Sequence, residues 1–194
     1  MNRPIVKGVV LAAGASRRLG RPKALVRLPS GEMLLARAVA CVRAAGVDVA
    51  VTVSPDNADV IAAARVIGVR TIPVPDAAEG MAASIRAAAH DAASDADCGG
   101  LLILLVDQWR VEAADLQRLL AAWRAGAPPV AARYEGVAGV PAVFGRQEFE
   151  ALMSLRGDAG ARSLLRDPSR AVGIVEMPNA AFDCDAIGDV PNPS

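Results

Sequence analysis

The stretch IVKGVVLAAGASRRLGRPK, residues 5–23, leads from an apolar run into a basic, glycine-containing loop. Residues 5–11 are typical of a buried strand, whereas residues 12–23 contain two glycines, a serine, three arginines and a lysine. Glycine loses more conformational freedom on folding than any other residue. A loop of this composition is therefore costly to order, which indicates that it serves a function.

Beyond this stretch, short strand-like runs alternate with alanine-rich helical stretches. We expect strands at 5–11, 48–53, 69–74, 100–106, 129–133, 141–144 and 172–176. We expect helices at 32–45, 56–67, 80–93, 112–125, 146–154 and 158–166. This alternation predicts βαβ units and a mostly parallel sheet. The predicted fold class is α/β, a Rossmann-like three-layer α/β/α sandwich, with residues 1–194 forming one domain.

Composition excludes several classes of protein. The chain carries 21 basic and 21 acidic residues, so it lacks the basic excess of a general nucleic-acid binder. No stretch approaches the roughly 20 apolar residues of a membrane span, and the N-terminus does not resemble a signal peptide. The cysteines (Cys41, Cys98 and Cys184) have neither metal-ligand spacing nor a paired framework. We therefore expect a cytoplasmic protein with no membrane or nucleic-acid partner.

The loop after the first strand has the composition of a phosphate site. In open α/β sheets, ligands lie beyond the carboxyl ends of the strands. Glycines allow close backbone approach to an anion, Ser16 adds a donor, and Arg18 and Lys23 add positive charge. Lys23 is one of only two lysines. The spacing matches neither GxxxxGK[ST] nor GxGxxG, and a basic surface turn remains the alternative.

Residues 12–23 resemble the signature loop AAGxSxR[ML]GxxK of the nucleotidyltransferases related to the molybdenum cofactor enzymes. The resemblance implies a fold of the nucleotide-diphospho-sugar transferase type and a loop that wraps a nucleoside triphosphate. It further implies that Arg18 and Lys23 hold the phosphates. The nucleotide-binding residues that it implies here are Leu11, Ala12, Ala13, Gly14, Ser16, Arg18 and Lys23.

Three further segments resemble the branch of this family that makes molybdopterin cytosine dinucleotide. Residues 80–85 match its GMxxS[IL] segment, residues 155–162 match LxGDxGAR, and residues 182–190 are similar to its terminal DIDTPEDL. The resemblance implies a nucleotide-binding role for Gly80 and Ser84 and an acceptor-side role for Asp158 and Arg162. For the last two residues, a simple i,i+4 ion pair on a helix is the alternative.

The resemblance favours CTP over GTP. Relatives that transfer guanylyl groups usually carry Leu-Ala-Gly-Gly in the first loop, whereas this chain has Ala13 in the third position. The extra methyl leaves less room beside the base, which fits a pyrimidine better. The effect is modest, since one methyl in a pocket is worth about 1–3 kcal/mol.

Asp107 ends the most apolar run of the chain, LLILLV at 101–106, and is the natural first ligand for Mg²⁺. The resemblance gives Asp107 this role and implies a second acid from the terminal segment, Asp185 rather than Asp183. The alternative for Asp107 is a helix N-cap. Three other acids, Glu112, Asp115 and Glu148, are expected on solvated helix faces.

These residues predict a Mg²⁺-dependent nucleotidyltransferase in which Lys23, Arg18 and Asp107 carry the catalysis. The resemblance implies transfer of CMP from CTP to the terminal phosphate of molybdopterin, with release of pyrophosphate. An apo-molybdoenzyme or its maturation factor would then be a partner. The chain departs from the family pattern at Trp109, Val140 and Ile187. These departures keep two alternatives open, which are another phosphate acceptor (a sugar or polyol phosphate) and a non-catalytic nucleotide- or cofactor-binding maturation factor.

Overall fold

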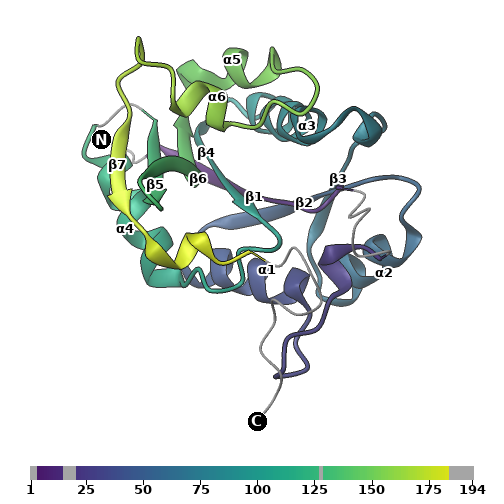
Figure 1. The fold of residues 1–194 in the computed structure, drawn as a ribbon. Coiled ribbons are helices and arrows are strands. Elements are labelled where there is room, and N and C mark those ends of the chain that lie inside the picture. Colours follow the sequence, from purple (N-terminus) through teal and green to yellow (C-terminus); the bar gives the residue numbers. More distant parts are fainter. Residues whose placement is uncertain (1–3, 15–20, 127–128, 184–194) are drawn as a thin grey trace.

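The computed structural model describes residues 4–14, 21–126 and 129–183. Their strands form a seven-stranded sheet in the order β3-β2-β1-β4-β6-β5-β7 (Figure 1). The strands are β1 (Ile5–Leu11), β2 (Asp48–Val53), β3 (Arg70–Pro73), β4 (Cys98–Leu105), β5 (Val130–Tyr134), β6 (Val137–Gly145) and β7 (Gly173–Glu176). Only β6 runs antiparallel to its neighbours β4 and β5, and the other pairs are parallel. The prediction of a mostly parallel sheet is confirmed.

Helices cover both faces of the sheet, which confirms the three-layer α/β/α sandwich (Figure 1). They are α1 (Leu34–Ala44), α2 (Ala58–Val66), α3 (Met81–Ala93), α4 (Ala113–Arg124), α5 (Phe149–Met153) and α6 (Arg162–Leu165). One apolar cluster joins α1, α2 and α4 to the sheet, and another joins α3, α5 and α6 to its opposite face. Because both faces are covered, the central strands are nearly continuous apolar runs.

The helix expected at 146–154 consists of the 3₁₀ turn η3 (Arg146–Glu148) followed directly by α5, and two other expected elements differ from the structure by more than two residues. The strand expected at 141–144 begins at Val137, because Glu135 and Gly136 adopt positive φ angles of 50° and 78° and form a tight hairpin with β5. The helix expected at 158–166 is only Arg162–Leu165. The residues before it instead form a turn against the start of α3, where the carbonyl of Gly157 accepts a hydrogen bond from the Ala82 N–H.

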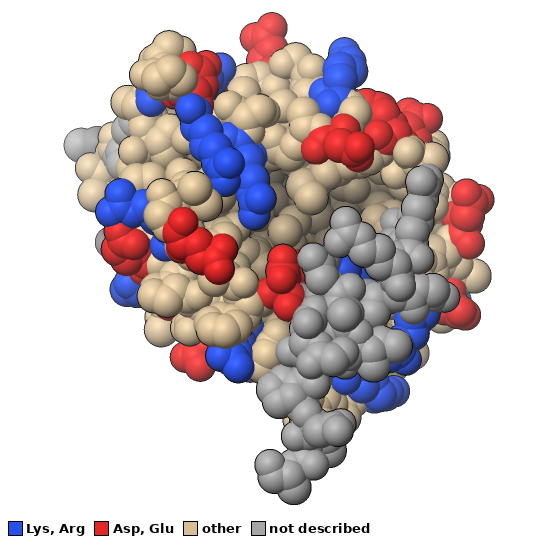
Figure 2. Space-filling view, in the orientation of Figure 1, with Lys and Arg blue, Asp and Glu red and all other residues tan. Residues whose placement is uncertain are grey.

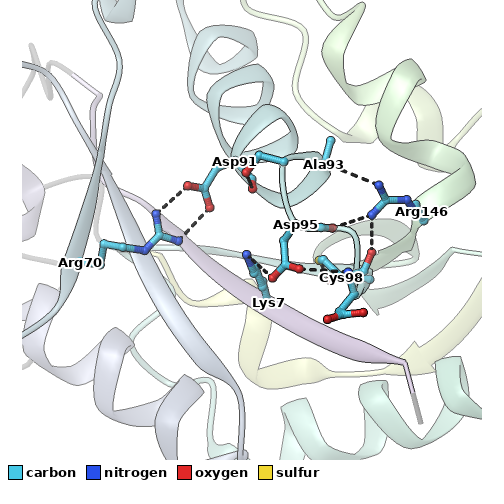
Figure 3. A network of polar contacts seen from close by, with 10 residues as sticks. Lys7, Arg70, Asp91, Ala93, Asp95, Cys98 and Arg146 are labelled. Carbon is cyan, nitrogen blue, oxygen red and sulfur yellow. Dashed lines mark hydrogen bonds and ion pairs between the residues drawn. The ribbon is translucent and has the colours of Figure 1, made fainter. Parts of the chain in front are cut away.

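A network of polar contacts connects the amino-terminal ends of the central strands (Figure 3). Lys7 in β1 lies 2.8 Å from Asp95 in the turn before β4. The guanidinium of Arg146 donates to the backbone carbonyls of Ala93, Asp95 and Cys98. This network closes the α3–β4 turn at the end of the sheet remote from the loop after β1.

In the part of the chain that the structure describes, no helix has the length and apolar character needed to cross a membrane.

The first peptide after β1 is fixed by a neighbouring strand. Leu11 is the register partner of Thr52 in β2, and the Thr52 hydroxyl accepts a hydrogen bond of 3.1 Å from the N–H of Ala12. Thr52 is fully buried. The hydroxyl therefore satisfies a buried donor where the chain leaves the sheet.

We expect Thr52→Val to lower the free energy of unfolding by about 1–3 kcal/mol, because it leaves the Ala12 N–H buried without an acceptor. Urea denaturation measures this change. Thr52→Ser is the matched control, since it retains the hydroxyl. Equal stabilities of the two variants would contradict the assigned hydrogen bond.

Candidate functional site

A pocket of about 580 Å³ lies at the carboxyl ends of β1 and β4. Leu11 and Leu105, the last residues of the two strands, are register partners, so the loops that follow them begin side by side. The residues that line the pocket are Leu11, Ala12, Gly14, Lys23, Ala24, Ala77, Ala78, Glu79, Gly80, Met81, Ser84, Leu105, Val106, Asp107 and Asp158. Both the size and the position suit a small-molecule ligand.

Lys23 and Asp107 form an ion pair in this pocket. Lys23 begins the short 3₁₀ helix η1 (Lys23–Leu25), and its Nζ lies 2.7 Å from Oδ2 of Asp107. The side chains are only 19% and 11% exposed. The second carboxylate oxygen, Oδ1, is buried and accepts no hydrogen bond from the described residues. A buried carboxylate oxygen without a donor is suited to a cation, and hard divalent cations prefer such oxygen ligands.

The N-cap alternative for Asp107 is not what the structure shows. Helix α4 is capped by Glu112, whose side chain accepts from the backbone N–H of Asp115 while Asp115 accepts from the Glu112 N–H. Asp115 is buried and also binds Arg118 and Asn179. The prediction that Asp115 lies on a solvated helix face was therefore wrong. The capping hydrogen bond and the donors Arg118 and Asn179 stabilise its carboxylate in a buried position.

Gln108 braces the strand end that carries Asp107. Its Oε1 accepts from the Leu105 N–H, and its Nε2 donates to the carbonyls of Val140 (2.8 Å) and Ala180 (3.1 Å). Val140 belongs to β6, and Ala180 to the 3₁₀ helix η4 (Pro178–Ala181). This buried amide therefore ties the Asp107 loop to a neighbouring strand and to the segment that leads toward Asp183.

A second ion pair holds another part of the pocket lining. Glu79, in the 3₁₀ helix η2 (Ala77–Glu79), pairs through both carboxylate oxygens with Arg86 of α3. The Gly157 N–H donates to Oε1 of Glu79 at 2.8 Å, and Nη1 of Arg86 donates to the carbonyl of Leu155 at 3.0 Å. These contacts fasten residues 155–158 onto the start of α3. The Arg86 guanidinium, together with the Gly157 N–H, lowers the pKa of Glu79 from 4.5 to about 2.

The structure gathers most of the expected site residues and separates a few. The pocket brings together Leu11, Ala12, Gly14, Lys23, Gly80, Ser84, Asp107 and Asp158. Ala13 is buried against Val74 and Ala83 and is not among the lining residues, so packing accounts for its methyl group. Arg162 also lies outside the lining and donates to the Tyr134 hydroxyl at 3.2 Å. Ser16, Arg18 and Asp185 fall outside the described residues.

The sequence did not predict the roles of Glu79 and Arg86 or the bracing role of Gln108. Their partners are mostly backbone groups of distant segments, for which a sequence carries no signal. The described residues contain no group of three or more His, Cys, Asp or Glu side chains able to hold a metal ion. Asp107 is therefore the one expected metal ligand that the described pocket supplies.

The sheet order, the pocket at the strand ends and its lysine–aspartate pair define the class as an α/β protein with a small-molecule site at the carboxyl ends of parallel strands (Figure 2). Figure 2 shows this face hollowed at its centre, with basic side chains on the side of α6 and acidic side chains on the side of α3. The chain belongs to the MobA-like NTP transferase domain family, whose model matches residues 8–172. The expected family is thus confirmed, and it is one of nucleotidyltransferases that bind nucleoside triphosphates.

Individual relatives extend the match over nearly the whole chain. Nicotine blue oxidoreductase of Paenarthrobacter nicotinovorans is 34% identical over 89% of this chain and 87% of its own length. The crystal structure of an Rv0371c homologue from Mycobacterium sp. strain JC1 is 31% identical, with a TM-score of 0.82, covering 97% of this chain and 94% of that one. Rv0371c of Mycobacterium tuberculosis H37Rv in complex with manganese is 28% identical, with a TM-score of 0.77 and 95% of both chains covered.

The Glu79–Arg86 pair predicts a pH-dependent contribution to stability. The pKa of Glu79 is lower in the folded protein than its ordinary value, so the pair stabilises the fold fully above about pH 4.5. That contribution is lost as the pH falls from about 4.5 toward 2. We therefore expect the difference in Tm between the wild type and Glu79→Gln to shrink over this interval.

Thermal unfolding followed by circular dichroism at a series of pH values measures this difference. Glu150→Gln is the matched control, because Glu150 is exposed on α5 and makes no ion pair within the described residues. A wild-type advantage over Glu79→Gln that stays constant down to pH 2 would contradict the pairing.

Proposed function

We propose that this protein transfers CMP from CTP to the terminal phosphate of a molybdopterin-type cofactor, with release of pyrophosphate and with Mg²⁺ as the divalent ion. The observation that carries the proposal is the Lys23–Asp107 pair in the pocket, with one buried oxygen of Asp107 left without a donor. The family match and the manganese complex of Rv0371c support the use of a nucleotide and of a divalent ion.

The residues would act by binding and neutralising charge rather than by covalent catalysis. Lys23 would exchange Asp107 for the phosphates, assisted by Arg18. Asp107 would hold the metal, with Asp185 as the second acid, and bound Mg²⁺ would supply charge neutralisation for the triphosphate. The acceptor phosphate oxygen forms a bond to the α-phosphorus as the bond from that phosphorus to the oxygen bridging to the β-phosphate breaks.

The acceptor would approach from the side of β5 and β6, where Arg162 lies beside Tyr134. Arg162 is the residue we assign to the acceptor, and an apo-molybdoenzyme or its maturation factor would receive the product. Asp158 was expected on the same side but lines the pocket with Gly80 and Ser84. A sugar or polyol phosphate as acceptor, or nucleotide binding without chemistry, is an alternative for the same pocket.

A second candidate function is an oxidoreductase, which the name of the 34% identical relative favours. The pocket would then hold part of a dinucleotide electron carrier. Consumption of NADH or NADPH in the presence of nicotine blue, without release of pyrophosphate from any nucleoside triphosphate, would select this function over nucleotidyl transfer.

The proposal predicts that Lys23→Ala lowers kcat/KM for CTP by about 10²- to 10³-fold, the usual loss when one charge-stabilising donor is removed. Pyrophosphate release from CTP and from GTP, with Mg²⁺ and molybdenum cofactor, is the measurement. Asp107→Asn should reduce release comparably. Release that is faster with GTP than with CTP would contradict the choice of base.

The chain offers a matched control, because its other lysine is also paired with an aspartate. Lys7 and Asp95 lie 2.8 Å apart at the amino-terminal ends of the strands, and the Lys7 side chain is 20% exposed (Figure 3). Lys7→Ala should therefore leave kcat/KM unchanged while removing an equivalent ion pair. Full activity in Lys23→Ala would overturn the phosphate assignment.

A further inference from the structure

Asp158 places a second carboxylate in the lining of the pocket that holds the Lys23–Asp107 pair. It stands in the turn before α6, over Gly80, which is the N-cap of α3. A Cβ on Gly80 would clash with Oδ1 of Asp158 and lie 2.8 Å from the carbonyl oxygen of Gly157. Gly80 also has a φ of 126°, a conformation that favours glycine. Only glycine therefore permits this close approach.

The turn that carries Asp158 is fixed from two sides. The Gly157 peptide donates its N–H to Glu79 and accepts from the Ala82 N–H through its carbonyl, and Arg86 holds the Leu155 carbonyl. The Asp158 side chain itself accepts no hydrogen bond from the described residues. Its backbone is thus held in place while its carboxylate is left open to a ligand.

Charge decides which part of a nucleotide faces this part of the lining. A triphosphate is drawn to Lys23 and repelled by the carboxylate of Asp158. The lining near Asp158 also contains Ala77, Ala78 and Met81, whose apolar side chains suit the flat face of a base, and the Glu79 carboxylate between them is paired with Arg86. A carboxylate only accepts hydrogen bonds, so the edge of the base that meets Asp158 must donate.

Ser84 completes the recognition pattern. It lies one helical turn after Gly80 on α3 and lines the same pocket. Its hydroxyl can donate to a ring nitrogen or carbonyl oxygen beside the group that Asp158 accepts from. The amino group and ring nitrogen of cytosine match this pair, whereas uracil presents a carbonyl oxygen to the carboxylate.

Resting on the proposed function, we propose that Asp158 reads the exocyclic amino group of the base and so makes the pocket select against uracil and thymine nucleotides. This makes Asp158 a specificity-determining residue on the nucleotide side rather than the acceptor side. It also gives the Glu79–Arg86 pair a positioning role, because that pair holds the turn in place.

The test is calorimetric titration of the full chain with CTP, UTP and 2′-deoxy-CTP in the presence of Mg²⁺ and without acceptor. The wild type should bind CTP about 10- to 100-fold more tightly than UTP, as expected for a hydrogen bond to a charged group. Asp158→Asn should bring the two affinities close together, because the amide can donate to the uracil oxygen.

Asp76→Asn is the matched control. Asp76 is exposed next to η2 and outside the pocket lining, so this variant removes the same charge nearby. It should preserve the preference for CTP. Circular dichroism confirms that each variant is folded before titration.

The outcomes separate this inference from the proposed function. Equal binding of CTP and UTP by the wild type would overturn the role of Asp158 while leaving nucleotidyl transfer intact. If Asp158→Asn weakens the binding of CTP and UTP equally and leaves that of 2′-deoxy-CTP unchanged, the carboxylate belongs to the ribose and the inference is likewise overturned. A wild type that binds no nucleoside triphosphate would overturn the proposed function, and this inference with it.

Discussion

The pairing of β1 with β4 is the constraint on which the pocket depends. These two apolar strands lie at the centre of the sheet and end in register at Leu11 and Leu105. The chain leaves the sheet from both strands at the same level, so Lys23 and Asp107 meet although 84 positions separate them. A shift of one residue in this register would turn the side chains to the other face of the sheet and separate the two charges.

Much of the fold could be predicted from the sequence, because its signals are local. The central strands read as continuous apolar runs, and the intervening alanine-rich stretches have helical length. The β5–β6 hairpin shows where this approach stops. Its turn depends on Glu135, a non-glycine residue with a φ of 50°. The amino-acid composition does not predict that a glutamate adopts this conformation. The short α6 is a similar case, since contacts with α3 rather than helix propensity decide where it begins.

The residues of the candidate site differ in the same way, because some carry a local signal in the sequence and others do not. Asp107 was found because it directly follows the most apolar strand, and Lys23 because it stands in a basic, glycine-containing loop that matches the family motif. Gln108, Glu79 and Arg86 were not, since their main partners include carbonyl and N–H groups contributed by remote segments. The Ala13 methyl was expected beside the base, but in the structure it packs against Val74 and Ala83. The Ala13 methyl therefore gives no support to a choice of base.

The pocket lies where the two helical layers come together around the sheet end. Ala24 belongs to the apolar cluster of α1, α2 and α4, whereas Leu11 belongs to the cluster of α3, α5 and α6. A ligand that fills the pocket contacts residues of both layers, and because only the folded chain forms this pocket, its binding free energy adds to the stability of the fold. At a ligand concentration about 100 times the Kd, this linkage amounts to about 2.7 kcal/mol. The abundance of the folded protein in a cell would then follow the supply of its ligand.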